Sequence, residues 1–155
     1  MKKVAFLVYG LVLAIALALW EIQIEGGAGW AGNLPCWRIE NGLIVKILGG
    51  RPLTGYHFFL VTFLVLMFHF LFLFTTWKFR KELFVLGFLV GLFLVEDFLW
   101  FLLNPEWGIG KFREGMIWWH PTWWGPVPDF YWWFAIIAGI LLYFGWSAIK
   151  EKRLK

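Results

Sequence analysis

The stretch VGLFLVEDFLWFLLNP, residues 90–105, places two adjacent carboxylates in a segment that is otherwise almost entirely apolar. Glu96 precedes Asn104 by eight residues, so in a helix it lies about 12 Å below the end of the segment. An ionisable group inside a bilayer costs roughly a few kcal/mol or more. We therefore expect Glu96 and Asp97 to have polar or cationic partners at the same depth.

The rest of the chain has the same apolar character. Of its 155 residues, 61% are hydrophobic and only 15% are charged, which is typical of membrane proteins and not of soluble domains. A helix needs roughly 20 apolar residues to cross a hydrocarbon core about 30 Å thick. Four segments meet this requirement, at about residues 4–25, 56–77, 83–104 and 130–149. We predict an all-α membrane protein, a single integral membrane domain over residues 1–155, folded as a four-transmembrane-helix bundle.

The first segment has an alternative interpretation as a cleaved signal peptide. MKK precedes the apolar run, and the ALA sequence at residues 16–18 resembles a cleavage site. We expect the segment to be retained as a membrane span.

Basic residues predict the orientation, because Lys and Arg mark the cytoplasmic side of a membrane protein. In a four-span chain one side carries Lys2, Lys3, Lys78, Arg80, Lys81, Lys150, Lys152, Arg153 and Lys155. We therefore expect a protein of the cytoplasmic (inner) membrane with both termini in the cytoplasm. Since these residues flank spans and do not form one soluble face, the net charge of +4 does not indicate nucleic-acid binding.

Two long loops then lie on the extracytoplasmic side. In the first, WRIE and LIVKIL flank Asn41 and Gly42, a pair suited to a tight turn, which predicts a small hairpin. The second loop is rich in tryptophan, with WWHPTWWGPVPDFYWW at residues 118–133. Such residues form aromatic belts at headgroup level. The alternative is a lid or stacking surface over a pocket.

Few polar side chains are available near Glu96 and Asp97. Glu21 and Glu25 are four residues apart, so they share one face of the first helix, and His57 opens the second span on the same side. His120 lies in the second loop and could fold back. Acids on two spans with a histidine on a third form a ligand set for divalent cations.

This pattern predicts a divalent metal site, although no HExxH or cysteine cluster identifies the metal. The expected metal ligands are Glu21, Glu25, His57 and Glu96, and the expected catalytic residues are His120 and Asp97. The alternative is a structural network of protonated or ion-paired acids that holds the helices together.

His69 lies twelve residues beyond His57, about 18 Å along a helix, so the two histidines do not serve one site. Haem is not expected, because the chain has 3 histidines and two bis-histidine haems need more. His69 is expected to make an interhelical hydrogen bond near mid-membrane, or to handle protons separately.

A cysteine, two glycines and four cations bear on disulfides, oligomers and headgroup binding. The single cysteine, Cys36, excludes an internal disulfide. Gly87 and Gly91 form a GxxxG sequence that would permit a homo-oligomer through close helix approach. The second side of the membrane also carries cations that could grip a phosphate headgroup or pair with Glu40, Glu106, Glu114 and Asp129. These cations are Arg38, Arg51, Lys111 and Arg113.

The sequence thus favours a small metal-dependent membrane enzyme, a hydrolase or an oxidoreductase, that acts on a membrane lipid or another amphiphile. Two alternatives stay open. One is a non-enzymatic component that binds or transports a cation or protons, and the other is a structural accessory subunit of a membrane complex. No motif ties the chain to a characterised family.

Overall fold

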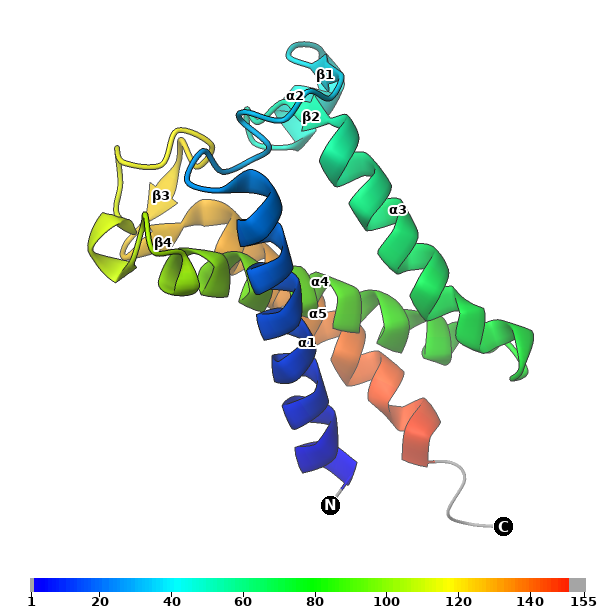
Figure 1. Ribbon diagram of the computed structural model, residues 1–155. Helices are drawn as coiled ribbons and strands as arrows, with labels where there is room; N and C mark the ends of the chain where they lie inside the picture. The colour runs from blue at the N-terminus through cyan, green and yellow to red at the C-terminus, as the bar shows by residue number, and fades with distance from the viewer. Residues whose placement is uncertain (1, 151–155) are drawn as a thin grey trace.

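The computed structural model describes the backbone of residues 2–150 and the side chains of residues 4–146 (Figure 1). It is 64% helical, and four helices are long and apolar enough to cross a membrane, which confirms the predicted class. These helices are α1 (Lys2–Glu25), α3 (Gly55–His69), α4 (Phe79–Leu103) and α5 (Asp129–Lys150). The side chains of Lys2, Lys3, Lys150, Lys152, Arg153 and Lys155, on which the predicted orientation rests, lie outside the described part.

The helix ends follow from local chemistry. Asn104 precedes Pro105, and it leaves the helical conformation with φ −73° and ψ 118°, so α4 ends where the proline predicts. Its side chain donates to the Gly26 carbonyl at 2.9 Å, which ties the end of α4 to the end of α1. The span that contains α3 is shorter than predicted, because α3 ends at His69 and a 3₁₀ turn (Phe70–Leu73) completes it.

Helices α4 and α5 pack closely through glycines. A Cβ at Gly87 would lie 2.8 Å from the Leu142 backbone nitrogen, and one at Gly145 would lie 2.5 Å from the Phe84 nitrogen. The GxxxG face, including Gly91 opposite Ala138, is therefore occupied by α5 of the same chain. The homo-oligomer through Gly87 and Gly91 stays a prediction, with α5 of the same chain already packed on these glycines.

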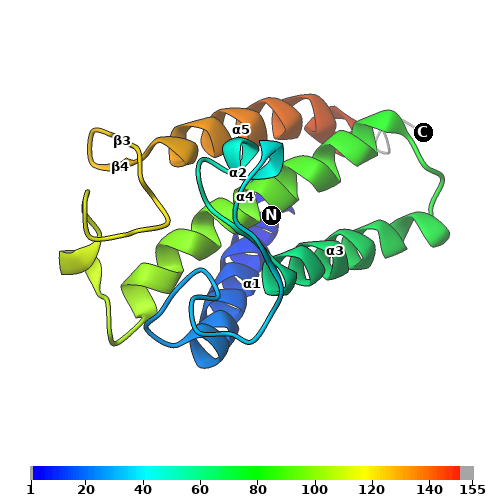
Figure 2. The same ribbon diagram turned by 90° about the horizontal axis from the view of Figure 1, so that it is seen from above.

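Helix α1 crosses α4, whereas α3 leans away from α1 and approaches α4 near the turn that joins them (Figures 1 and 2). The arrangement is more open than a four-helix bundle with parallel contacts along every helix. An apolar core fills the middle of the molecule, formed by Ala14, Leu17, Leu60, Leu64, Val85, Phe88, Leu89 and Leu92. We call the end where α1 stops and α3 begins the site end, and the end with the α3–α4 turn the turn end.

The first loop differs from the predicted hairpin. The LIVKIL segment forms a short helix, α2 (Leu43–Ile47), which begins after Gly42 at φ 90°. The prediction of a turn at Asn41 and Gly42 is therefore wrong. A two-residue ladder does form, but β1 (Arg38–Ile39) pairs with β2 (Leu53–Thr54), which directly precedes α3. The strand thus positions the start of α3, and α2 fills the connection.

The tryptophan-rich loop folds back onto the site end. It contains a 3₁₀ turn (Ile109–Lys111) and a second small ladder between β3 (Trp123–Trp124) and β4 (Val127–Pro128). Trp119 is only 3% exposed and packs in a second core cluster with Trp100 and Phe101. Other tryptophans at the site end remain exposed, as an aromatic belt requires. They are Trp118, Trp124, Trp132 and Trp133.

Candidate metal site

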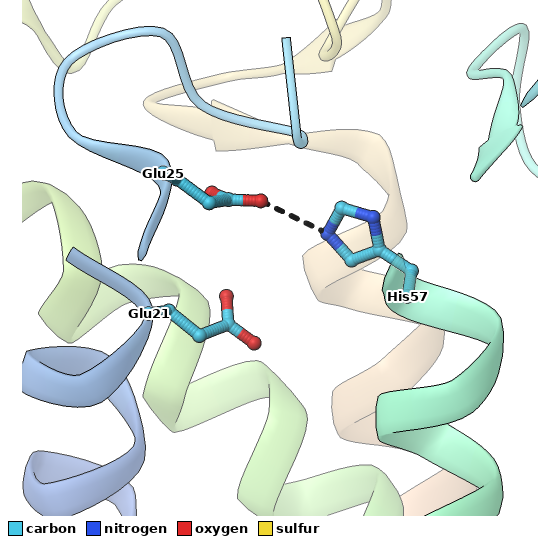
Figure 3. Close-up of side chains that lie close together, drawn as sticks. All are labelled: Glu21, Glu25 and His57. Carbon is cyan, nitrogen blue, oxygen red and sulfur yellow. Dashed lines mark ion pairs between the residues drawn. The ribbon is translucent and has the colours of Figure 1, made fainter. Parts of the chain in front are cut away.

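Three of the four predicted metal ligands converge at the site end. Glu21 and Glu25 lie on the last turns of α1, and His57 lies in the first turn of α3. One ligand atom from each lies within 4.8 Å of the others. Figure 3 shows both carboxylates and the imidazole pointing into the space between α1 and α3, with Glu25 Oε1 3.4 Å from His57 Nε2. Both glutamates are buried, so this cluster is shielded from solvent.

An unusual backbone turn holds Glu25. Gly29, Trp30 and Ala31 have φ of 59°, 47° and 53°, and the left-handed conformation costs about 1–2 kcal/mol for a residue with a Cβ. The turn aims the Ala31 N–H at Glu25 Oε1, where it donates at 2.6 Å. Arg38 stabilises the turn by donating to the Ala31 and Gly32 carbonyls. The strained conformation of Trp30 and Ala31 thus serves to orient the Glu25 carboxylate.

His57 is oriented by two neighbours. Its Nδ1 lies 2.7 Å from the hydroxyl of Thr54, the N-cap residue of α3. The Trp30 ring stacks on the imidazole with ring centroids 4.1 Å apart and an interplanar angle of 19°. In the tautomer with the proton on Nδ1, that atom donates to Thr54 and leaves the Nε2 lone pair facing the carboxylates. A metal-binding histidine is characteristically supported in this way.

Glu96 faces the same cavity from α4 but is outside the three-ligand cluster. The cavity has a volume of about 390 Å³ and is lined by Glu21, Glu25, His57, Glu96 and Asp97 together with apolar and aromatic side chains. Glu96 is 5% exposed, and its Oε1 has no hydrogen-bond partner among the described residues. A buried polar atom without a partner is costly, so this oxygen fits a site that takes a cation.

The predicted catalytic residues lie together beside this cluster. Asp97 Oδ2 accepts a hydrogen bond from the Tyr131 hydroxyl at 2.5 Å, and His120 Nε2 lies 3.5 Å from the same oxygen. His120 is 3% exposed and stacks on Phe130, so the second loop folds back as expected. Asp97 lines the cavity, whereas His120 is not among the described residues that line it. The His120 imidazole therefore lies beside Asp97, without a hydrogen bond from its Nε2 to any described residue.

Sequence reasoning missed Tyr131 and Thr54. Nothing in the pattern separates Tyr131 from the neighbouring aromatic residues, and its role follows only from the packing of α5 against α4. The signal for Thr54 was present but unused, because threonine is a favoured N-cap residue and it lies three residues before His57.

Among the four cations considered from the sequence, only Arg51 lines the cavity. Its guanidinium carbon lies 4.7 Å from the centroid of Trp30 and 4.6 Å from that of Phe130. Burial lowers the pKa of the Arg51 guanidinium from its ordinary value, while the Asp97 and Asp129 carboxylates oppose this shift. No ion pair found among residues 4–146 includes Arg51, so pairing with Asp129 is not observed.

His69 occupies a separate place at the turn end. Its Nε2 bonds Glu82 Oε1 at 2.7 Å, and its Nδ1 donates to the Val65 carbonyl, also at 2.7 Å. The expected interhelical hydrogen bond is confirmed, since Glu82 belongs to α4. The expected mid-membrane depth is wrong, because His69 is the last residue of α3.

Comparison of the chain with family models, with curated proteins and with solved structures gave no match. Any assignment of function therefore depends on the geometry of the site.

Proposed function

We propose that this protein is an integral membrane enzyme that uses a divalent metal ion to act on an amphiphilic substrate. The main support is the convergence of Glu21, Glu25 and His57, whose ligand atoms lie within 4.8 Å of one another beside a cavity of about 390 Å³. Oxygen ligands with one imidazole suit Mg²⁺, Mn²⁺, Fe²⁺ or Zn²⁺. Glu96 completes the proposed ligand set from α4, through the oxygen for which the described part of the chain offers no hydrogen-bond partner.

The proposed orientation places this cavity on the extracytoplasmic side of the cytoplasmic membrane and both termini in the cytoplasm. The support is the positive-inside rule applied to the basic residues of the sequence. The cavity then lies in the outer half of the bilayer, where the hydrocarbon part of a lipid-like molecule can reach it from the side.

The residues around the cluster suit hydrolysis. A bound divalent ion supplies Lewis acidity and lowers the pKa of a coordinated water. Asp97 lines the cavity and is the proposed general base for that water, with the Tyr131 hydroxyl donating to its carboxylate and the His120 imidazole 3.5 Å away. Oxidation at the same ligand set is the alternative chemistry.

A transport component is the second candidate, but the packing favours it less. An ion or proton path would have to connect the site end with His69 and Glu82 at the turn end. Leu60 and Leu64 of α3 and Leu89 and Leu92 of α4 are buried between these two places along their helices. A structural accessory role would require a partner that supplies cations to the buried acids.

Elemental analysis tests the proposal directly. The protein is purified in a neutral detergent, loaded in turn with Mn²⁺, Fe²⁺ and Zn²⁺, and washed before its metal content is measured. We expect about one ion per folded chain, and a loss of at least roughly tenfold in affinity for Glu25→Gln and His57→Gln. His69→Gln is the matched control, because it changes the same residue type on the same helix and should leave the metal content unchanged.

Two outcomes would overturn the assignment. The first is a wild-type protein that retains none of these metals. The second is equal metal content in the wild type and in both site variants. Robust metal- or proton-dependent flux in liposomes would instead move the function to transport.

A further inference from the structure

The cavity holds a positively charged side chain that the proposed metal chemistry does not use. Arg51 comes from the first loop, just before β2, and it is the only arginine or lysine among the described residues that line the cavity. Two other loop cations are engaged elsewhere. Arg38 holds the Ala31 carbonyl, and Lys111 donates to the Glu106 carbonyl at 2.5 Å.

Arg51 is held in place, but no carboxylate of residues 4–146 forms an ion pair with it. The Trp30 and Phe130 rings lie on it at 4.7 Å and 4.6 Å, and its Nε donates to the Leu48 carbonyl at 2.9 Å. The terminal guanidinium nitrogens remain for a ligand. A planar guanidinium whose position is fixed by stacking suits bidentate recognition of a carboxylate or a phosphate.

The walls of the cavity indicate what the rest of that ligand is. Beyond the polar cluster they are apolar, formed on the α3 and α4 sides by Phe58, Val61, Val90 and Phe93. Phe58 and Val61 are 45% and 41% exposed, so the cavity wall continues into the apolar outer surface of α3. These partly exposed side chains place apolar lining of the cavity at the surface of α3, where a hydrocarbon chain can lie against it.

Charge balance decides when an anion can enter. Four carboxylates line the cavity, from Glu21, Glu25, Glu96 and Asp97, against the one guanidinium of Arg51. In the ionised state they repel an anionic headgroup unless a divalent cation compensates for them. The metal and the anionic ligand should therefore bind cooperatively.

We infer that Arg51 is the headgroup anchor for an amphiphile that carries a carboxylate or a phosphate and one hydrocarbon chain, with the chain lying between α3 and α4. The inference rests on the proposed metal-dependent function, because the metal is what makes the cavity accept an anion. The substrate is then an anionic amphiphile. Arg51 selects its headgroup, which the metal cluster alone does not do.

Calorimetric titration in a neutral detergent tests this inference. The ligands are dodecanoate, dodecyl phosphate, dodecanol and inorganic phosphate, each added to protein with and without Mn²⁺. We expect at least one anionic amphiphile to bind the metal-loaded protein about tenfold or more tightly than dodecanol or inorganic phosphate, with little binding in the absence of metal. The comparison of dodecanoate with dodecyl phosphate identifies which headgroup is preferred.

Variants of Arg51 supply the matched controls. Arg51→Met should lower the affinity for the anionic amphiphile about 10- to 100-fold, and Arg51→Lys should fall between, because lysine keeps the charge without the planar fork. Both variants should keep the wild-type metal content, which shows that the site end is folded. Arg113→Met, at an exposed cation of the second loop, should change neither quantity.

The outcomes separate the two proposals. A protein that binds no metal defeats the proposed function. A protein that binds metal but does not distinguish dodecanoate or dodecyl phosphate from dodecanol defeats the role of Arg51 alone. Binding of the anionic amphiphile by Arg51→Met with wild-type affinity would also defeat it.

Discussion

The two ends of the molecule carry the same kinds of polar side chain and arrange them differently. At the turn end one histidine meets one glutamate, His69 and Glu82, at 2.7 Å, and the second Glu82 oxygen accepts from Trp77 at 3.0 Å. At the site end Glu21 and Glu25 lie close to His57, and Glu96 adds a buried oxygen without a hydrogen-bond partner in the described part of the chain. The pair of His69 and Glu82 satisfies both side chains, so a structural role is enough to explain it. The proposed metal site would account for this excess of buried acids around one histidine.

Replacing one acid at each end with methionine should have opposite effects on stability and should affect metal binding at the site end only. Glu96→Met should abolish measurable metal binding, a loss of about 100-fold or more. It should also stabilise the metal-free protein by about 1–3 kcal/mol, because a buried polar group without a partner is replaced by an apolar one. Unfolding in detergent, with and without metal, measures both effects.

Glu82→Met is the matched variant at the turn end and should have the opposite sign. It removes a satisfied partner of His69 and Trp77, so the metal-free protein should become slightly less stable while metal binding is unchanged. If Glu96→Met destabilised the metal-free protein as Glu82→Met does, then Glu96 would be a structural acid and not a ligand.

The same contrast shows what the sequence could predict. The four apolar helices and the gathering of Glu21, Glu25, His57 and Glu96 at one end follow from span length and alternating direction alone. These two rules predict how deep each residue lies in the membrane. They therefore predict which residues of different helices lie at the same depth. They do not set how closely the helices approach. The angle of α3 and the side chains that line the cavity depend on tertiary packing that periodicity does not encode.

The first loop shows the limit most clearly. Asn41 and Gly42 favour a hairpin turn, yet Gly42 instead precedes α2. The left-handed conformation of Trp30 and Ala31 is stabilised by Glu25 and Arg38, which are partners distant from any local turn signal. The site residues that the sequence missed, including Tyr131, are likewise defined by tertiary contacts.

The cost of adding a methyl group should depend on how closely the helices approach at that position. Gly87→Ala would press a methyl group against the Leu142 backbone on the closed α4–α5 face, so we expect a loss of about 1–3 kcal/mol in stability. Gly139→Ala is the matched control, because a Cβ at Gly139 meets nothing within 4 Å. Equal thermal stability of the two variants in detergent would show that α4 and α5 do not approach as closely as described.

The hydroxyl of Thr54 tests whether His57 is held for a ligand. Thr54→Val keeps the shape of the side chain but removes the contact to His57 Nδ1, so metal affinity should fall about tenfold. Thr54→Ser keeps the hydroxyl and should bind metal as the wild type does. The loss of the N-cap bond should also lower stability in the valine variant, by about 1 kcal/mol. Unchanged metal affinity in Thr54→Val would mean that His57 needs no support from this hydroxyl.

The smallest effect is expected at the turn end, where the histidine already has its partner. The His69 and Glu82 side chains are 28% and 20% exposed, and pairs with access to solvent contribute little. His69→Gln should therefore cost less than about 1 kcal/mol in unfolding free energy, since glutamine can still donate to a carboxylate. A loss of metal from this variant, measured beside His57→Gln, would show that the two ends are coupled through the apolar core. The distinction between a paired end and a ligand-binding end would then fail, because a change confined to one histidine would alter both.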